Sequence, residues 1–255
     1  MAKALISIVY YGESDAIKKA VDSIEKNTSV EKEIILVRNG GDRKAIEDLV
    51  SEYSDVRIVD LDKNVGFGAG HNAAFNDSGK NSEYFFIVNP DVILTSDAVD
   101  KLTEYMDGNS EVGASVPKLT DDDGNLLSVY RRDPTVTDMF LRRFIPFGFK
   151  KRYAYHTMQD ANYETAHEVP FPQGSFLCIR SSVFERVGGF DKRFFLYMED
   201  ADLCRKVRKE SKCMYYPGAS VVHFWNKGSH RSLKLFMIHI SSMIKYFNKW
   251  GWKLS

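Results

Sequence analysis

The sequence predicts an α/β fold in which helices flank a central, mostly parallel β-sheet. Short runs of β-branched and aromatic residues alternate with segments whose apolar residues recur at helical spacing. One run, residues 84–88, is too continuously apolar to have a solvated face, which is typical of a strand covered on both sides. With 255 residues and 44% hydrophobic content, the chain can bury a sizeable core as one domain.

The first half of the chain alternates strand and helix patterns in strict order. Strands are expected at residues 5–9, 34–37, 56–61 and 84–88. Helical stripes are expected between them, at residues 17–24 behind a Ser14 or Asp15 cap, at 46–53, and directly after the glycine-rich turn 64–70. Such alternation predicts parallel strands joined by helices that cross the sheet faces.

The alternation breaks after Val116. Residues 120–125 form an acidic turn, and 131–168 mix aromatic and charged residues without a clear period, which indicates a mobile, partner-facing insertion. Regular patterns then return. They predict a strand within 174–179, a helix from about 199 to 210, a short strand at 220–224 and a helix at 232–249.

Charge and cysteine content narrow the classes of function. The 35 basic and 35 acidic residues cancel, so overall charge does not point to nucleic acid as a partner. Cys178, Cys204 and Cys213 have no paired spacing and are expected as reduced core thiols. We find no signal peptide and no run near the ~18 to 20 apolar residues that span a bilayer, so a cytoplasmic protein is expected.

The C-terminal segment is basic and aromatic. From Ser211 to Ser255 there is no Asp or Glu, against seven Lys and Arg. This pattern suits a helix lying on an anionic membrane surface. It equally suits a helix that packs its apolar face on the rest of the protein and leaves its lysines in solvent. The aromatic and apolar residues concerned are Trp225, Phe236, Ile240, Phe247, Trp250 and Trp252.

Asn89-Pro90-Asp91 directly follows the strand at 84–88. Open parallel sheets bind ligands at the carboxyl ends of their strands. A carboxylate on a rigid turn there suits Mg²⁺ or Mn²⁺, which combine few protein oxygens with phosphate oxygens. The tripeptide taken alone is more typical of a plain turn than of a site. Its position after a buried strand favours the metal site.

The glycine-rich turn Asn64 to Gly70 allows backbone to approach a ligand closely. It lacks the G-x-G-x-x-G spacing and follows the third strand, which argues against dinucleotide binding.

Glu199-Asp200-Ala201-Asp202 places three carboxylates at a predicted helix start, where the helix dipole favours them. The apolar residues 194–198 before them would desolvate the cluster and keep one carboxylate basic enough to take a proton. Arg205 and Arg208 lie further along the same helix, in reach of the cluster or of phosphates.

Two histidines are weaker candidates. His223 ends a β-branched run, where a lone histidine is more often a core residue than a ligand. His71, which opens the helix after the glycine turn, is weaker still.

Taken together and in order, these segments resemble glycosyltransferase family 2, the inverting GT-A enzymes, and in particular its rhamnosyltransferase-like members. The resemblance covers most of the chain. It is carried by residues 7–11, 64–72, 89–91, 188–191, 194–204 and 222–224.

The resemblance implies a role for each candidate. Asp91 stands at the metal-binding aspartate of the family's D-x-D motif, with His223 completing the metal site. Asp200 matches the catalytic base, and Glu199 beside it orients the acceptor. The implied nucleotide-sugar site comprises Tyr10, Tyr11, Asn39, Asn64, Gly66, Gly68, His71, Asn72, Asn89, Asp91, Gly174 and Arg205.

Two positions depart from the family pattern. Asn89 replaces the first aspartate of D-x-D, although asparagine is common here in the rhamnosyltransferase-like group. Arg38 stands where many members carry an aspartate that holds the base or ribose.

The implied function is metal-dependent transfer of a sugar from a nucleotide-diphosphate donor to a glycan or lipid-diphosphate-linked glycan in bacterial cell-surface polysaccharide synthesis, such as that of O-antigen. dTDP-rhamnose is the favoured donor and Mg²⁺ or Mn²⁺ the cofactor. Another donor, such as a UDP-sugar, and a non-catalytic nucleotide-sugar-binding module remain open. A nucleotidyltransferase is disfavoured, because Tyr11-Gly12-Glu13-Ser14 is no basic glycine-rich loop. Within one domain, residues 1–117 would bind donor, 118–225 acceptor, and 226–255 form the basic segment.

Overall fold

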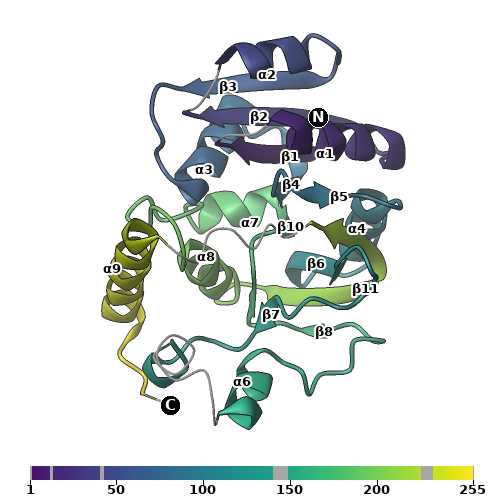
Figure 1. Cartoon of the computed structure of the whole chain (residues 1–255). Coiled ribbons are helices and arrows are strands. Elements are labelled where there is room, and N and C mark those ends of the chain that lie inside the picture. Colours follow the sequence, from purple (N-terminus) through teal and green to yellow (C-terminus); the bar gives the residue numbers. More distant parts are fainter. Residues whose placement is uncertain (1, 12–13, 41–42, 140–148, 225–231, 255) are drawn as a thin grey trace.

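The structure, a computed structural model, describes residues 2–11, 14–40, 43–139, 149–224 and 232–254. Nine strands within these residues join in one sheet, flanked by helices (Figure 1). The expected α/β class is confirmed. Cys178, Cys204 and Cys213 are buried, as expected for thiols that fill the core.

The N-terminal half of the sheet is parallel, with strand order β3-β2-β1-β4. Its interior residues, including Ile6, Leu36 and Phe86, have no exposed surface because helices cover the sheet. The strands are β1 (Ala2–Tyr10), β2 (Lys32–Asn39), β3 (Val56–Leu61) and β4 (Ser82–Val88). The connecting helices are α1 (Ser14–Asn27), α2 (Arg43–Val50) and α3 (Phe67–Asp77).

The C-terminal half of the sheet is mixed. Strand β10 (Phe176–Arg180) runs antiparallel between β4 and β6 (Val112–Thr120). Strand β11 (Lys212–His223) is parallel to β6 and antiparallel to β5 (Val92–Ile93) and β8 (His167–Glu168). Parallel pairing is therefore limited to the N-terminal strands and the β6–β11 pair. The helices of this half are α4 (Ala98–Asp107), α7 (Ser181–Arg186) and α8 (Glu199–Val207).

The described parts of the aperiodic segment are tied to the sheet. Tyr130 is fully buried, and its hydroxyl donates to Pro117 O at 2.6 Å and accepts from Leu119 N at 2.8 Å. The segment contributes β7 (Tyr130–Arg131), which pairs with β9 (Phe171–Pro172), and α6 (Lys150–His156). Residues 140–148 of the expected insertion lie outside the described part of the chain.

The C-terminal helix α9 (Leu233–Trp250) packs on the rest of the protein with its C-terminal half. Tyr246 and Phe247 are buried in a second apolar cluster, separate from the main core, which we call the C-terminal cluster. Its buried members are Met139, Phe171, Phe194, Met198, Ala201, Tyr246 and Phe247. The packing interpretation of the basic segment is thus right for this half, while Trp225, Lys227 and Arg231 lie outside the described residues. No helix among the described residues is long and apolar enough to cross a membrane.

Candidate active site

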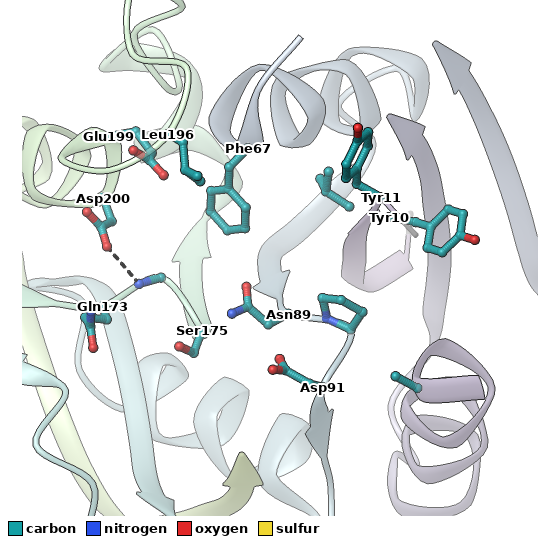
Figure 2. Close-up of a pocket in the computed structure, with 14 residues that line it drawn as sticks. Tyr10, Tyr11, Phe67, Asn89, Asp91, Gln173, Ser175, Leu196, Glu199 and Asp200 are labelled. Carbon is teal, nitrogen blue, oxygen red and sulfur yellow. Dashed lines mark hydrogen bonds between the residues drawn. The ribbon is translucent and has the colours of Figure 1, made fainter. Parts of the chain in front are cut away.

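A cavity of about 660 Å³ opens at the carboxyl ends of β1 and β4. Its lining comes from the end of β1, the turn after β4, residues 173–175 before β10, and the start of α8 with the loop before it, together with Ala16 of α1 and Phe67 of α3 (Figure 2). Because β10 runs antiparallel to β4, with Phe176 opposite Val88, its first residues meet the last residues of β4 at this edge.

The Asn89-Pro90-Asp91 turn is held by backbone bonds on three sides. Asn89 N donates to Ser175 O at 2.8 Å, Val92 N to Asn89 O at 3.2 Å, and Phe224 N to Asp91 O at 3.0 Å. The tripeptide is therefore a turn and also a wall of the cavity, since all three of its residues line the space.

Asp91 and His223 meet at this wall. His223 Nε2 lies 3.1 Å from Asp91 Oδ1, because the end of β11 pairs with β5 just beyond the turn. Adjacent ligands of a hexacoordinate Mg²⁺ or Mn²⁺ lie roughly 3 Å apart, and such ions take their remaining oxygens from phosphate and water. The two side chains therefore fit a divalent ion that a diphosphate helps to hold. Among the described residues, a set of three potential ligands occurs at Asp121, Asp122 and Asp123, outside the cavity lining.

The opposite wall carries Glu199 and Asp200 at the first turn of α8 (Figure 2). The two residues before them, Tyr197 and Met198, both adopt left-handed backbone conformations, with φ of 69° and 67°. Non-glycine residues rarely adopt this region, and adjacent pairs concentrate at functional sites. The pair turns the chain so that the helix begins at the cavity.

The two carboxyl groups differ in environment. Burial, reinforced by the neighbouring Asp200 charge, raises the pKa of Glu199 to about 8, so Glu199 is protonated at neutral pH. Burial also raises the pKa of Asp200, but N–H groups favour its ionised form: Ala201 N donates at 2.8 Å and Gly174 N at 3.3 Å. One group can donate a hydrogen bond while the other accepts a proton.

Several residues of the cavity were missed in the sequence. Polar residues that follow a strand are the ones a parallel sheet predicts at a ligand site, whereas Gln173 and Ser175 precede β10. Because β10 is antiparallel to β4, its first residues and not its last lie at the cavity. Phe67 and Leu196 have apolar side chains that carry no chemical signal. Burial raises the pKa of Asp200, and the charge of Arg131, nearly buried on β7 and outside the cavity lining, offsets part of this rise, an influence that no local pattern predicts.

The glycine-rich turn packs closely against the loop that leads to α8. A Cβ at Gly66, whose φ is 96°, would lie 2.3 Å from Phe195 O, and one at Gly68 would lie 2.7 Å from Phe190. The glycines therefore let α3 pack against the loop that leads to α8. Of this turn, Phe67 lines the cavity.

Asn39 and Asn64 stabilise the same turn. Asn39 Nδ2 donates to Asn64 Oδ1 at 3.0 Å and to Gly66 O at 3.1 Å, and Asn39 Oδ1 accepts from Val65 N at 2.8 Å. Neither asparagine belongs to the cavity lining. Their contact with a nucleoside stays a prediction.

His71 and Asn72 are likewise used within the protein. His71 has no exposed surface, pairs with Ser7 Oγ at 2.8 Å, and burial lowers its pKa to about 3. Asn72 Nδ2 donates to Phe190 O at 2.8 Å, and its Oδ1 accepts from Phe190 N at 2.9 Å. Asn72 thus stabilises the Phe190 turn and His71 pairs with β1, and their contact with a donor stays a prediction.

Arg205 also points elsewhere. Its Nη1 lies 3.3 Å from the Tyr246 hydroxyl, and its guanidinium lies over the Trp250 ring at 4.7 Å, so it faces α9 and not the cavity. Arg208 pairs with Asp133. By contrast Tyr10 and Tyr11 line the cavity, Tyr10 almost fully buried and Tyr11 69% exposed.

Comparison with known proteins gives consistent results. A family model described as "Glycosyl transferase family 2" matches residues 5–188. Rhamnosyltransferase WbbL of Escherichia coli (strain K12) is 26% identical over 250 residues, covering 94% of this chain and 91% of that protein. The N-acetylglucosaminyl-diphospho-decaprenol L-rhamnosyltransferase of Mycobacterium tuberculosis (strain ATCC 25618 / H37Rv) is 26% identical over 226 residues, covering 84% and 74%.

Two solved structures share the fold at 15% identity and cover 97% of this chain. GalNAc-T7 with UDP, GalNAc and Mn²⁺ superposes with a TM-score of 0.72, and this chain spans 48% of its length. The mannosyltransferase PcManGT from Pyrobaculum calidifontis in complex with GDP-Man and Mn²⁺ superposes with a TM-score of 0.65, and this chain spans 64% of its length. The fold match spans the whole sheet, and the family model covers most of the residues that build the cavity. The chain therefore belongs to glycosyl transferase family 2 and is a glycosyltransferase of the GT-A fold.

Proposed function

We propose that the protein transfers L-rhamnose, with inversion, from dTDP-rhamnose to a hydroxyl of a glycan or lipid-diphosphate-linked glycan in cell-surface polysaccharide synthesis. One observation carries the proposal: a single cavity has Asp91, backed by His223, on one wall and Asp200 on the other. The rhamnosyl donor is favoured by two relatives that are named as rhamnosyltransferases. The lipid-linked acceptor is favoured by the decaprenol-diphosphate in one of those names.

The proposed reaction is a single displacement. Asp200 takes the proton from the acceptor hydroxyl as its oxygen bonds to the anomeric carbon, and the bond from that carbon to the diphosphate oxygen breaks. Asp91 and His223 would hold Mg²⁺ or Mn²⁺, which when bound offsets the negative charge of the departing diphosphate.

Glu199 has a separate part in this proposal. A buried, protonated carboxyl donates one hydrogen bond, so Glu199 orients the acceptor hydroxyl without competing for its proton. Its Oε2 is buried and has no hydrogen-bond partner among the described residues, and in this proposal the acceptor hydroxyl becomes its partner. In this proposal residues 1–117 hold the donor and residues 118–225 the acceptor, with His223 of the second range joining Asp91 at the metal wall.

The decisive experiment incubates the protein with a panel of dTDP-, UDP- and GDP-sugars, with and without Mg²⁺ or Mn²⁺, and follows donor hydrolysis and transfer to a lipid-diphosphate glycan. Metal-dependent turnover of dTDP-rhamnose above the other donors is expected. Preference for a UDP-sugar would replace the donor. Binding without turnover, unchanged in Asp200→Asn, would favour a non-catalytic nucleotide-sugar-binding module.

We further propose that α9 brings the protein to an anionic membrane surface on the cytoplasmic side, where such an acceptor would lie. Leu233, Met237 and Ile244 are exposed along this helix at helical spacing, with Lys234 beside them. Apolar residues flanked by lysines suit the interface of an anionic bilayer.

Flotation with anionic and neutral vesicles tests this placement. Leu233→Glu combined with Met237→Glu should abolish flotation with anionic vesicles, while the matched control Ser51→Glu with Ser54→Glu, which adds the same charge at exposed sites distant in the chain, should not. Equal flotation of both variants would remove the membrane role. Point variants are preferable to deleting α9, since deletion would uncover the C-terminal cluster.

A further inference from the structure

Helix α8, which carries Asp200, is bonded to the C-terminal helix α9 through a buried carboxylate. Asp202, in the first turn of α8, has no exposed surface. Lys249 Nζ lies 2.7 and 2.9 Å from its two oxygens, and Trp250 Nε1 donates to it at 2.7 Å. A carboxylate removed from water is tolerated only when charge-assisted hydrogen bonds satisfy it, and both donors come from α9.

The same helix also holds the loop that leads into α8. Lys249 Nζ bonds Asp191 at 2.9 Å, Lys245 Nζ donates to Arg193 O at 2.7 Å, and Ser242 Oγ donates to Leu196 O at 2.9 Å. The Leu196 side chain reaches the cavity. Contacts from α9 therefore continue along this loop to the cavity wall.

The loop ends in two residues whose backbone conformation is intrinsically unfavourable. Tyr197 and Met198 are both left-handed, and such conformations persist only where surrounding contacts determine them. Those contacts again involve α9. The Tyr197 ring lies 4.9 Å from His239, and Met198 is buried in the C-terminal cluster with Tyr246 and Phe247.

We propose that Lys249 and Trp250, acting through Asp202, are positioning residues that hold the start of α8 so that Asp200 and Glu199 face the substrate. This inference rests on the proposed function for its kinetic consequence. The α9 clamp, meaning Asp202, Lys249 and Trp250, touches neither Asp91 nor His223. Donor binding on that wall is therefore independent of it, whereas the geometry of proton transfer depends on it.

The experiment compares Lys249→Met, Lys249→Arg and the control Lys26→Met, which removes an exposed lysine from the last turn of α1. Lys249→Met should lower kcat roughly tenfold to a hundredfold, as displaced catalytic groups do, with the donor KM within about twofold of wild type. Lys249→Arg keeps the charge and should recover most of kcat. Lys26→Met should leave both constants unchanged. All four proteins are assayed below their melting temperatures, so that lost folding does not contribute.

Hydrogen exchange gives a second readout that needs no turnover. In Lys249→Met the amides of residues 193–201 should exchange at least tenfold faster, while those of β1 and β4 stay as in wild type. If wild type transfers no sugar, the proposed function fails and exchange still tests the clamp. Unchanged exchange at 193–201, or a kcat in Lys249→Met equal to wild type, would overturn the positioning role. A rise in donor KM matching the fall in kcat would overturn it too.

Discussion

The two walls of the cavity are built by different means. Asp91 follows β4 and His223 ends β11, and backbone bonds to Ser175, just before β10, and to Phe224, just after β11, hold the Asp91 turn. Glu199 and Asp200 begin a helix whose place depends on side chains of α9. Backbone ladders tolerate most side-chain changes, whereas a clamp of a few side chains is lost with one of them. The wall proposed to hold metal and diphosphate is therefore the rigid one, and the wall proposed to carry the base, the base-bearing wall, is the sensitive one.

The sharpest test of the base-bearing wall is Asp200→Asn. The amide keeps the shape of the side chain but cannot take a proton, so kcat should fall about a hundredfold to ten-thousandfold with donor affinity nearly intact. Steady-state kinetics and donor-binding calorimetry measure both quantities. Near-normal turnover would remove Asp200 as the base.

Gly66→Ala tests the turn that separates the two walls. The residue has φ 96° and ψ 168°, a region essentially reserved for glycine, and its new Cβ would meet Phe195 O. We expect a loss of about 3 kcal/mol or more in the free energy of unfolding, measured by urea denaturation.

The matched control is Gly79→Ala, where φ is 67° but nothing lies within 4 Å of the added carbon. It should cost about 1 to 2 kcal/mol from backbone conformation alone. Equal losses in the two variants would show that the contact with Phe195 contributes nothing.

The rigid wall is tested by metal dependence. Excess EDTA should abolish turnover, Mg²⁺ or Mn²⁺ should restore it, and His223→Gln should raise the metal concentration needed by about tenfold or more. His167→Gln changes a histidine whose Nδ1 lies 3.0 Å from Thr165 O, where His223 instead meets Asp91, and serves as control. Full activity in EDTA would rule out the metal role of Asp91 and His223.

Glu199→Gln should give the smallest change and alter mainly the pH profile. The pKa of Glu199 is about 8 in the folded protein, against the ordinary 4.5. The folded state therefore binds this proton more tightly than the unfolded state does, and this contribution to the free energy of unfolding is fully present below about pH 4.5. It is lost as the pH rises from there through about 8. Wild-type turnover should decline above pH 8 as Glu199 ionises beside Asp200. Glutamine cannot ionise, so the variant should lack this decline and lose less stability between pH 6 and 9. Superimposable pH profiles of turnover and melting temperature would contradict the assignment.

The parallel half of the fold was predictable because each of its strands is a short run of β-branched and aromatic residues, a pattern visible within the segment itself. Residues 56–61 were expected as a strand and form β3 with those bounds, and the run at 84–88 became β4. The direction in which a strand joins the sheet is not visible in its residue pattern. Nothing in the pattern of Phe176–Arg180 shows that β10 runs antiparallel, which is why Gln173 and Ser175 were missed.

The candidate site shows the same division. Asp91, Gly174, Glu199 and Asp200 were expected in one site, and all line the cavity. His71, Asn72 and Arg205 were assigned to the donor, yet each has its nearest partners within the protein. Motif position places a residue near a site. Which way its side chain turns depends on neighbours distant in the chain.

By itself the sequence determined the α/β class, the strand-end turn at Asp91 and the acidic helix start at Glu199, because periodicity and turn chemistry are local. The family resemblance implied that His223 joins Asp91, but the tertiary structure alone shows the contact across 132 positions, and only it decided that Lys249 holds Asp202 across 47. Such pairs form where strands and helices meet in the folded chain. Their attraction depends on distance in space, which spacing along the chain does not encode.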